Sequence, residues 1–331
     1  MDFSSNESIY KEVLKARERI KGHVWRTPLE FSDYLSKETG VNVYLKYESD
    51  QVSGTIKARG AFNTVLKMSE SNGEEKKDIC PKKFVAASTG NHGIALLYAL
   101  KSSQDKCVVY VPTSTAQVKL DHLQRLGAEI KMKGSDMTVT MELAEQAAKK
   151  EGCIYVSPCK NPDVIAGQGT IAYEIFRDLP NVDAIFVYVG GGGMISGISS
   201  YAKHVHSKIQ IVGCGPKHSN GMEESIKAGK PIDIEIKPSL SITGNIGLDS
   251  VTFPICQRNV DRWVNVTEDE IADAMYLMLD VHHKAVEGAA GCVLASFLKV
   301  KNDFKGQNVA IVICGSNVSP NILKKVIDKH T

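Results

Sequence analysis

Four consecutive glycines at residues 190–193 are the strongest chemical signal in the sequence. They follow the apolar run AIFVYV and precede a helix-forming segment that starts near Met194. A glycine loop between a strand and a helix can present several backbone N–H groups to a phosphate, because no Cβ blocks close approach. A plain turn would not need four glycines, which lose much conformational entropy on ordering. We predict a phosphate site formed by Gly190, Gly191, Gly192, Gly193 and the amino end of the helix that begins near Met194.

This loop fits a single phosphate better than a nucleotide. The dinucleotide fingerprint G-x-G-x-x-G needs a third glycine where this chain has Ile195 or Ser196. It also needs an acidic residue after the next strand, where the chain has Cys214 and Gly215. A Walker loop would require G-K-[ST] after its glycines, and none follows here. A compact cofactor with one phosphate is therefore indicated.

Lys57 supplies the amine that such a cofactor could need. It lies in the stretch SGTIKARG, between a glycine-bearing turn and a helix-forming run, where a lysine adds little to packing. Most lysines are solvated surface charges, so Lys57 alone would indicate nothing. Together with the glycine loop it fits a phosphorylated aldehyde, which needs a phosphate site and an amine for a Schiff base. We predict pyridoxal 5′-phosphate (PLP) as the cofactor and Lys57 as the residue bonded to it.

The stretch ASTGNHGIA at residues 87–95 is a candidate substrate site. It is a second strand, turn and helix start, whose backbone N–H groups could hold a substrate α-carboxylate. Serine and threonine at a helix start are also ordinary caps, and a single histidine there is more often a packing residue. The residues of this candidate site are Ser88, Thr89, Gly90, Asn91 and His92.

The strand VAIVI near the carboxyl end runs into Cys314, followed by Gly-Ser-Asn. The simplest interpretation is a buried strand end. Beside a pyridoxal ring, however, a neutral thiol or hydroxyl would leave the ring nitrogen largely unprotonated. That weakens the electron sink and favours expulsion of a β-substituent over a long-lived carbanion.

Composition limits the class of protein. The chain has 331 residues, 43% apolar and 24% charged, with a net charge of +2, which is typical of a globular protein without a nucleic-acid or membrane partner. Its eight cysteines form no C-x-x-C pair, so we expect reduced thiols and neither zinc nor disulfides. The polar amino terminus predicts an amphipathic helix and no secretory signal, so we expect a cytoplasmic protein.

The order of the elements predicts an α/β fold. From residue 84 onward, short β-rich runs alternate with helical patterns, and a second series of the same kind begins near residue 167. Long helices are expected at residues 268–283 and 289–300. We predict two parallel-sheet α/β domains with the active site in the cleft between them.

Five stretches together carry a family resemblance. They are SGTIKARGA, STGNHGIAL, VIAGQGTIA, VGGGGMISG and CGSNVS, in this order. In order and separation they resemble the serine racemase and serine/threonine dehydratase (ammonia-lyase) family, fold type II PLP enzymes related to the tryptophan synthase β chain. The likeness covers nearly the whole chain, from about residue 20 to residue 319.

Residue by residue, the resemblance implies a set of cofactor contacts beyond the glycine loop. Lys57 would form the covalent link and act as the base, Asn91 would contact the ring hydroxyl, and Cys314 would face the pyridine nitrogen. Ile56 would pack on the ring, and Glu287 would lie near it.

The resemblance also implies the domain organisation and the assembly. A small mobile domain at residues 84–159 would close over the substrate, and residues 1–83 with 160–331 would form the large PLP-binding domain. The usual assembly in the family is a homodimer.

Three departures from the family pattern concern the reaction and the metal. Thr89 stands where serine racemases have a catalytic serine and dehydratases usually have alanine, and Cys159 stands where racemases tend to have asparagine. Gly215 and Gly221 stand where the family's metal-binding carboxylates would be, so we expect no metal ligand set unless Glu223 or its neighbour substitutes. We expect the extra methyl of Thr89 to restrict its hydroxyl and turn it toward the backbone as a helix cap.

Elimination is the reaction that the sequence favours. The predicted substrate is L-serine, L-threonine or a related β-hydroxy amino acid, converted to a 2-oxo acid and ammonia with Lys57 as base. The alternative is racemisation of serine to D-serine, with Thr89 as the second acid/base. A protein that binds PLP or an amino acid for regulation, without turnover, is the alternative from another class.

Overall fold

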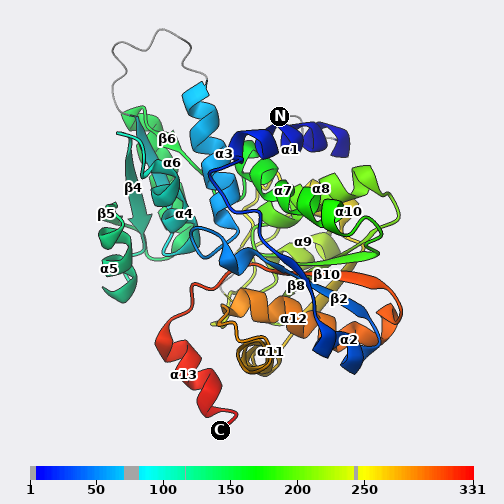
Figure 1. Ribbon diagram of the computed structural model, residues 1–331. Coiled ribbons are helices and arrows are strands. Elements are labelled where there is room, and N and C mark those ends of the chain that lie inside the picture. Colours follow the sequence, from blue (N-terminus) through cyan, green and yellow to red (C-terminus); the bar gives the residue numbers. More distant parts are fainter. Residues whose placement is uncertain (1–4, 71–81, 116, 242–244) are drawn as a thin grey trace.

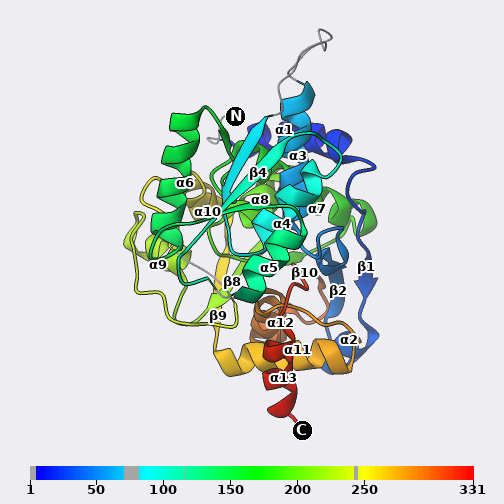
Figure 2. The ribbon, with the colours of Figure 1, turned by 90° about the vertical axis from the view of Figure 1, so that its left-hand side faces the viewer.

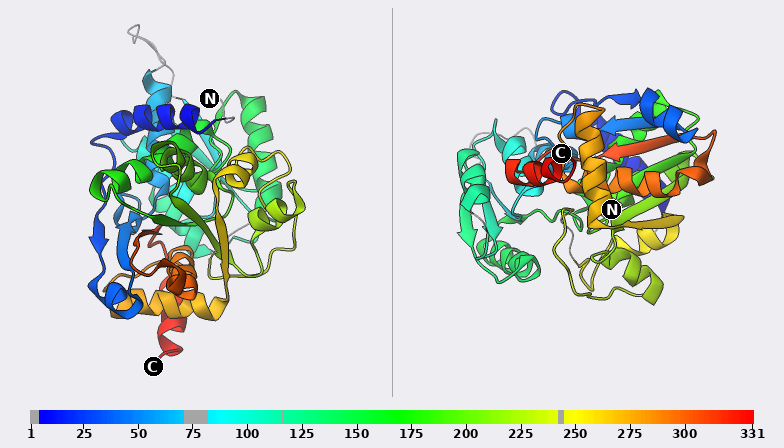
Figure 3. Two further views of the ribbon diagram at one scale, coloured as in Figure 1. Left: turned by 90° about the vertical axis from the view of Figure 1, so that its right-hand side faces the viewer. Right: turned by 90° about the horizontal axis from the view of Figure 1, so that it is seen from below.

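The computed structural model describes residues 5–70, 82–115, 117–241 and 245–331 (Figure 1). It contains a six-stranded sheet in the order β1-β2-β10-β7-β8-β9 and a four-stranded sheet in the order β5-β4-β3-β6. Figures 1 and 3 show the two sheets side by side, each with its own helices, and Figure 2 views the molecule from the side of the smaller sheet. The predicted α/β class with two parallel-rich sheets is confirmed.

The strands and helices have the following bounds. The larger sheet contains β1 (Leu29–Phe31), β2 (Asn42–Tyr47), β7 (Ala184–Tyr188), β8 (Gln210–Pro216), β9 (Arg262–Val266) and β10 (Asn308–Ile313), and the smaller contains β3 (Lys83–Ala87), β4 (Lys106–Val111), β5 (Glu129–Met132) and β6 (Ile154–Tyr155). The helices are α1 (Asn6–Ile20), α2 (Asp33–Thr39), α3 (Lys57–Glu70), α4 (Asn91–Leu100), α5 (Gln117–Arg125), α6 (Met137–Glu151), α7 (Pro162–Asp178), α8 (Gly193–Val205), α9 (Gly221–Ala228), α10 (Phe253–Asn259), α11 (Glu268–Asp280), α12 (Gly288–Val300) and α13 (Pro320–Asp328).

All strand pairs of the smaller sheet are parallel, as are those of the larger sheet except one. The exception is β1, which pairs antiparallel with β2 through contacts such as Leu29 with Lys46. This edge strand was not predicted, because three residues are too few to show a hydrophobic alternation. The strands of the smaller sheet lie within residues 83–155. The boundaries 84–159 and the mobility of that region stay predictions.

The long helices near the carboxyl end differ slightly from the prediction. α11 begins at Glu268 with a capping box made by Thr267 and Glu270, but it ends at Asp280 instead of residue 283. His283 has a φ of 55°, in the left-handed region, so the helix cannot continue through it. α12 begins one residue earlier than expected, at Gly288.

The predicted amino-terminal helix is present as α1. The Ser5 side chain caps it by accepting from the Ser8 N–H, and its apolar face buries Ile9 and Val13. In the described part of the chain, no helix is long and apolar enough to cross a membrane. Seven cysteines are unpaired thiols, as expected, and Cys80 lies outside the described residues.

Glycines allow the helices beside the larger sheet to approach one another closely. A Cβ on Gly167 would lie 2.5 Å from the Arg59 carbonyl oxygen of α3, and a Cβ on Gly197 of α8 would lie 2.2 Å from the Ile165 carbonyl oxygen of α7. Both distances are shorter than real contacts allow, so α3, α7 and α8 could not pack this way with larger residues. The stretch VIAGQGTIA therefore serves helix packing.

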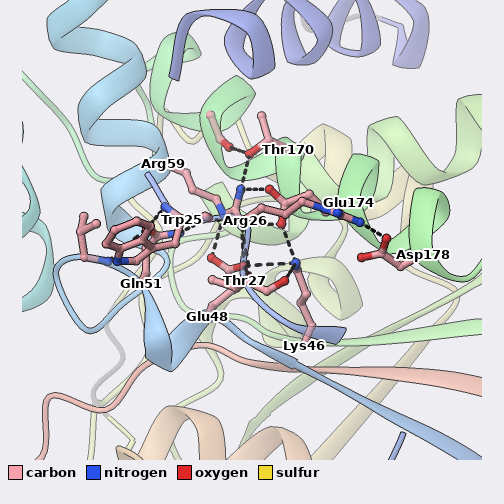
Figure 4. A network of polar contacts seen from close by, with 12 residues as sticks. Trp25, Arg26, Thr27, Lys46, Glu48, Gln51, Arg59, Thr170, Glu174 and Asp178 are labelled. Atoms are coloured by element: carbon pink, nitrogen blue, oxygen red, sulfur yellow. Dashed lines mark hydrogen bonds and ion pairs between the residues drawn. The ribbon is translucent and has the colours of Figure 1, made fainter. Parts of the chain in front are cut away.

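A buried cluster of charges lies beneath the start of α3 (Figure 4). The Arg59 guanidinium, with no exposed surface, bonds both carboxylate oxygens of Glu48 and both of Glu174 at 2.7–2.8 Å. The equally buried Lys46 ammonium pairs with Glu174. Because two cations and two carboxylates meet here, the cluster is neutral as a whole, and each charge depends on its partners.

We expect Arg59→Met to lower the free energy of unfolding by about 3–5 kcal/mol, because it leaves two buried carboxylates with one cation. The exposed pair of Arg262 with Asp303 offers a matched control, and Arg262→Met should cost no more than about 1 kcal/mol. Urea unfolding followed by circular dichroism measures both. Equal losses in the two variants would contradict the importance of the cluster.

Candidate active site

Lys57 is the first residue of α3 and lies beside the carboxyl end of β10. The Ile56 N–H donates to the Cys314 carbonyl at 3.1 Å, and the Ser316 N–H donates to the Gly54 carbonyl at 2.9 Å. The Thr55 hydroxyl also donates to the Cys314 carbonyl, at 3.3 Å. These bonds bring Lys57 and Cys314 together, as the resemblance implied, and bury Ile56 next to them.

The Lys57 ammonium is half-buried and makes no hydrogen bond to another described residue. Burial lowers its pKa below the usual lysine value, because desolvation disfavours the charged form, although the Glu287 carboxylate nearby opposes this effect. An amine with a lowered pKa and no fixed partner is suited to act as nucleophile and base.

The glycine loop lies between β7 and α8. Gly192 has a φ of 81°, and a Cβ there would come within 2.7 Å of both Met222 and Thr252. The Thr252 hydroxyl donates to the Gly191 carbonyl at 2.8 Å and so holds the loop. Neither Thr252 nor Met222 was a predicted site residue, because neither belongs to a local motif.

The amino end of α8, where Met194 is buried, has no side-chain cap. Its first backbone N–H groups therefore lack the usual side-chain acceptor, and the glycines before it leave no Cβ in the way. This arrangement fits the phosphate of PLP, which would be held by the residues of the loop 190–193 and the first turn of α8.

The amino end of α4 also lacks a side-chain cap. Gly90 occupies the cap position without a side-chain hydrogen bond, and space is open around its Cα. Ser88 accepts the Gly90 N–H at 3.1 Å. The Thr89 hydroxyl is half-buried and bonds to no described residue, so the expectation that it caps the helix is wrong. Because Gly90 takes the cap position, the Thr89 hydroxyl is available to a ligand.

The His92 side chain does not take part in this candidate substrate site. Burial lowers its pKa to about 4, so the ring is neutral, and its Nε2–H donates to the Val156 carbonyl at 2.7 Å. His92 can therefore offer a substrate its backbone N–H but not a charged ring. The interpretation of a single histidine as a packing residue holds for its side chain.

Asn91 and Glu287 connect the two halves of the molecule. The Asn91 amide donates to both carboxylate oxygens of Glu287 at 2.9 Å, which joins the amino end of α4 to that of α12. The Asn317 amide donates to the Asn91 oxygen at 2.8 Å and to the Ser53 carbonyl at 3.0 Å. Burial raises the pKa of Glu287 to about 7, although Asn91 and Lys57 oppose the shift.

Two neutral thiols lie near Lys57. Burial raises the pKa of Cys314 well above its ordinary value, and burial also raises the pKa of Cys159. A Cβ on Gly191 would lie 2.9 Å from the Cys159 sulfur, so this thiol borders the glycine loop. The sequence marked Cys159 only as a departure from the family pattern, and the contact with the loop appears only in the folded chain.

The space beside Gly215 is filled by a side chain of the protein itself, and Gly221 is the buried first residue of α9. A Cβ on Gly215 would lie 2.7 Å from the Asn220 amide nitrogen. One oxygen of the buried Glu223 accepts from the amides of Asn220 and Asn265, and the other pairs with the Lys227 ammonium at 2.9 Å. Amide N–H groups and an ammonium face this carboxylate, whereas a hard cation needs several oxygen ligands.

We expect a chelator to leave the melting temperature unchanged, and added magnesium or calcium to leave it unchanged as well. The physical reason is that Lys227 and two amides already satisfy Glu223. Differential scanning fluorimetry with and without EDTA measures this. A melting temperature that falls on chelation and recovers with magnesium would contradict the expectation.

We expect the contribution of Glu287 to the unfolding free energy of the cofactor-free protein to fall as pH rises from about 4.5 to about 7, while His92, whose pKa is lowered to about 4, contributes in the opposite direction. The pKa of this carboxyl is raised in the folded chain, from 4.5 to about 7, so the folded state binds the proton more tightly. Its contribution is complete below pH 4.5 and lost by about pH 7, on the order of 3 kcal/mol at about 1.4 kcal/mol per pKa unit.

The stability advantage of wild type over Glu287→Gln should fall by about 3 kcal/mol between pH 4.5 and pH 7.5, because an amide does not titrate and His92 contributes equally to both proteins. The exposed Glu235 supplies the control, and Glu235→Gln should keep the wild-type slope. Urea unfolding at pH 4.5, 6 and 7.5 measures all three proteins. A difference between wild type and Glu287→Gln that does not change with pH would contradict the assignment.

A family model described as pyridoxal-phosphate dependent enzyme matches residues 20–315. An L-threonine ammonia-lyase of Thermotoga maritima is 35% identical over 322 residues, which cover 96% of this chain and 78% of that protein. A serine racemase of Dictyostelium discoideum is 32% identical over 324 residues, which cover 96% of this chain and 97% of that protein.

A solved structure agrees with the fold. The crystal structure of a pyridoxal 5′-phosphate-dependent aspartate racemase has a TM-score of 0.86 to this chain at 31% identity, and the match covers 98% of this chain and 99% of that one. The resemblance noted in the sequence and the predicted cofactor are both confirmed by these findings. The chain belongs to the pyridoxal-phosphate-dependent enzymes of fold type II, among relatives that include threonine ammonia-lyases and serine racemases.

Proposed function

We propose that the protein is an ammonia-lyase that converts L-threonine, L-serine or a related β-hydroxy amino acid to a 2-oxo acid and ammonia. The observation that supports this most directly is the Lys57 amine, which has a lowered pKa and no fixed partner, beside the neutral thiol of Cys314. Bound PLP supplies an electron sink at the substrate α-carbon. The other elements of the reaction come from the chain itself.

Binding rests on the starts of α8 and α4, which both follow glycines and lack a side-chain cap. The loop 190–193 and the first turn of α8 would hold the cofactor phosphate. The backbone N–H groups at the start of α4 would hold the substrate α-carboxylate, since no side chain caps this helix by accepting their hydrogen bonds. The substrate would thus be oriented with its α-carbon toward the cleft, where Lys57 begins α3.

Lys57 would then move the proton. Because its pKa is lowered, the Lys57 amine is neutral more readily than that of an exposed lysine. Its Nζ would take the proton from the α-carbon. The β-hydroxyl leaves with a proton as water, and the released enamine takes up water to give the 2-oxo acid and ammonia. A neutral Cys314 supplies no negative charge to stabilise a protonated ring nitrogen, which favours elimination over a long-lived carbanion.

Racemisation is the second candidate function, and Thr89 is the observation that favours it. Racemisation needs a proton donor on the face opposite Lys57, and the Thr89 hydroxyl bonds to no described residue. The methyl group on the Thr89 β-carbon still limits the directions in which this hydroxyl can point. A regulatory binder without turnover is the remaining alternative, and release of ammonia would exclude it. Assembly as a homodimer, a mobile small domain at residues 84–159 and a cytoplasmic location remain part of the proposal.

We expect the purified protein to form pyruvate from L-serine faster than it forms D-serine. Thr89→Ala should leave pyruvate formation within about threefold of wild type, while D-serine formation falls on the order of 10²-fold with loss of the acid. Thr89→Ser should raise D-serine formation, because the hydroxyl gains rotational freedom. The assay measures keto acid, ammonia and the enantiomer ratio with L-serine, D-serine and L-threonine.

Lys57→Ala is the control, and it should lose both reactions because it removes nucleophile and base at once. It should also lose the cofactor adduct that borohydride traps in the wild type. Two results would overturn the proposal. One is wild-type D-serine formation that outpaces pyruvate formation. The other is loss of elimination in Thr89→Ala.

A further inference from the structure

A cavity of about 230 Å³ lies outside the candidate active site, between the carboxyl ends of α1 and α7. Glu174 is the one carboxylate among its lining residues. Five cationic side chains line it: Arg17, Lys21, Arg26, Arg59 and Arg177. How much of this positive charge is available to a ligand depends on which cations are already neutralised within the protein.

The charges on the floor of the cavity are neutralised within the protein (Figure 4). Arg59 is fully engaged with Glu48 and Glu174, and Lys46 completes this buried cluster. Arg59 also bonds the Thr170 hydroxyl at 3.1 Å, which fixes the guanidinium against α7. The floor is therefore a rigid, neutral surface with no hydrogen-bonding capacity to spare on the guanidinium.

The charges at the mouth are only half neutralised. Arg17 pairs with Glu18, and Arg26 pairs with Asp178. No ion pair joins Lys21 or Arg177 to any residue within the described ranges. Four cations and two carboxylates leave an excess of two positive charges at the rim of one cavity. Cations at helix ends stabilise the helix dipole, but that role does not require them to meet around a cavity.

The mouth is built from two segments of the chain, residues 17–26 and the end of α7. Arg17 comes from the last turns of α1, Lys21 and Arg26 from the segment that follows, and Arg177 from the last turn of α7. The Arg17 guanidinium also lies over the Tyr173 ring, 4.8 Å from its centre, which holds it at the rim. Cations that converge from separate segments can surround a ligand on several sides.

We propose that this cavity binds a small phosphorylated metabolite. A phosphate monoester carries between −1.5 and −2 charges near neutral pH, roughly the excess at the mouth. Guanidinium groups bind phosphate oxygens in pairs, with charge-assisted hydrogen bonds, and three of the four cations at the rim are arginines. Arg26 and Arg177 are exposed, so a ligand can reach them without a change in the core.

A ligand here would contact the base of α3. Arg59 lies two residues after Lys57 on the same helix, and its partner Glu174 lines the cavity as well. Because the ligand binds the folded chain and not the unfolded one, it should raise the melting temperature. This effect does not depend on the reaction that the enzyme catalyses.

The test is calorimetric titration of the PLP-loaded enzyme with glycerol 3-phosphate, so that the glycine loop is already filled. We expect saturable binding of one ligand per chain and a higher melting temperature. Arg26→Gln and Arg177→Gln should each weaken binding on the order of tenfold, because each removes a charge-assisted hydrogen bond. Arg262→Gln, which removes another exposed and paired arginine, should leave binding unchanged.

Lys21→Gln provides a second variant at the mouth and should also weaken binding. Three outcomes would overturn the proposal. They are the absence of saturable binding to wild type, wild-type affinity in both Arg26→Gln and Arg177→Gln, and an equal loss of affinity in Arg262→Gln. Succinate, a dianion without phosphate, should bind more weakly, and equal affinity for succinate would overturn the commitment to a phosphorylated ligand. Because binding alone is measured, failure here would leave the proposed lyase activity untouched.

Discussion

The position at which α3 begins is the constraint on which the rest of the cleft depends. From one side, backbone bonds attach the segment before Lys57 to the carboxyl end of β10 at Cys314. From the other side, Arg59 anchors the first turn of α3 in a buried cluster of charges. A lysine amine that must reach a reacting atom cannot sit on a loosely held helix end, because a small displacement costs much of the rate. Two independent sets of bonds fix it here.

The two proposed anion sites follow from the order of strands and helices. Parallel strands end at one edge of their sheet, and the helices that follow begin there, so helix starts with free N–H groups gather at the cleft. α8 and α4 both begin without a side-chain cap, after glycine residues. Ordinary helices would use a Ser, Thr, Asp or Asn side chain at this position, as α1 does with Ser5. Leaving the N–H groups open lowers helix stability but reserves them for ligands.

Charge is distributed unevenly around Lys57. The groups closest to it are neutral thiols and the Glu287 carboxyl, whose pKa is raised to about 7 by burial. The full charges lie beneath α3, in the cluster of Arg59 and its partners, or at the surface. The groups around Lys57 are therefore of low polarity, and in such surroundings a lysine loses its proton more readily than in water. Figure 4 shows the charged cluster around Arg59 with its partners Glu48, Glu174 and Lys46.

The sequence by itself determined the parallel α/β fold, the glycine loop at residues 190–193, Lys57 and the helix start at Asn91, because each of these signals lies within one contiguous stretch. Only the tertiary structure decided that Asn91 bonds Glu287, 196 residues away, that Cys159 borders Gly191, and that the Thr89 hydroxyl is free. The antiparallel strand β1 and the cationic cavity belong to the same group. Local patterns record backbone propensity and burial, whereas contacts between distant segments follow from strand order and helix packing, which no single stretch encodes.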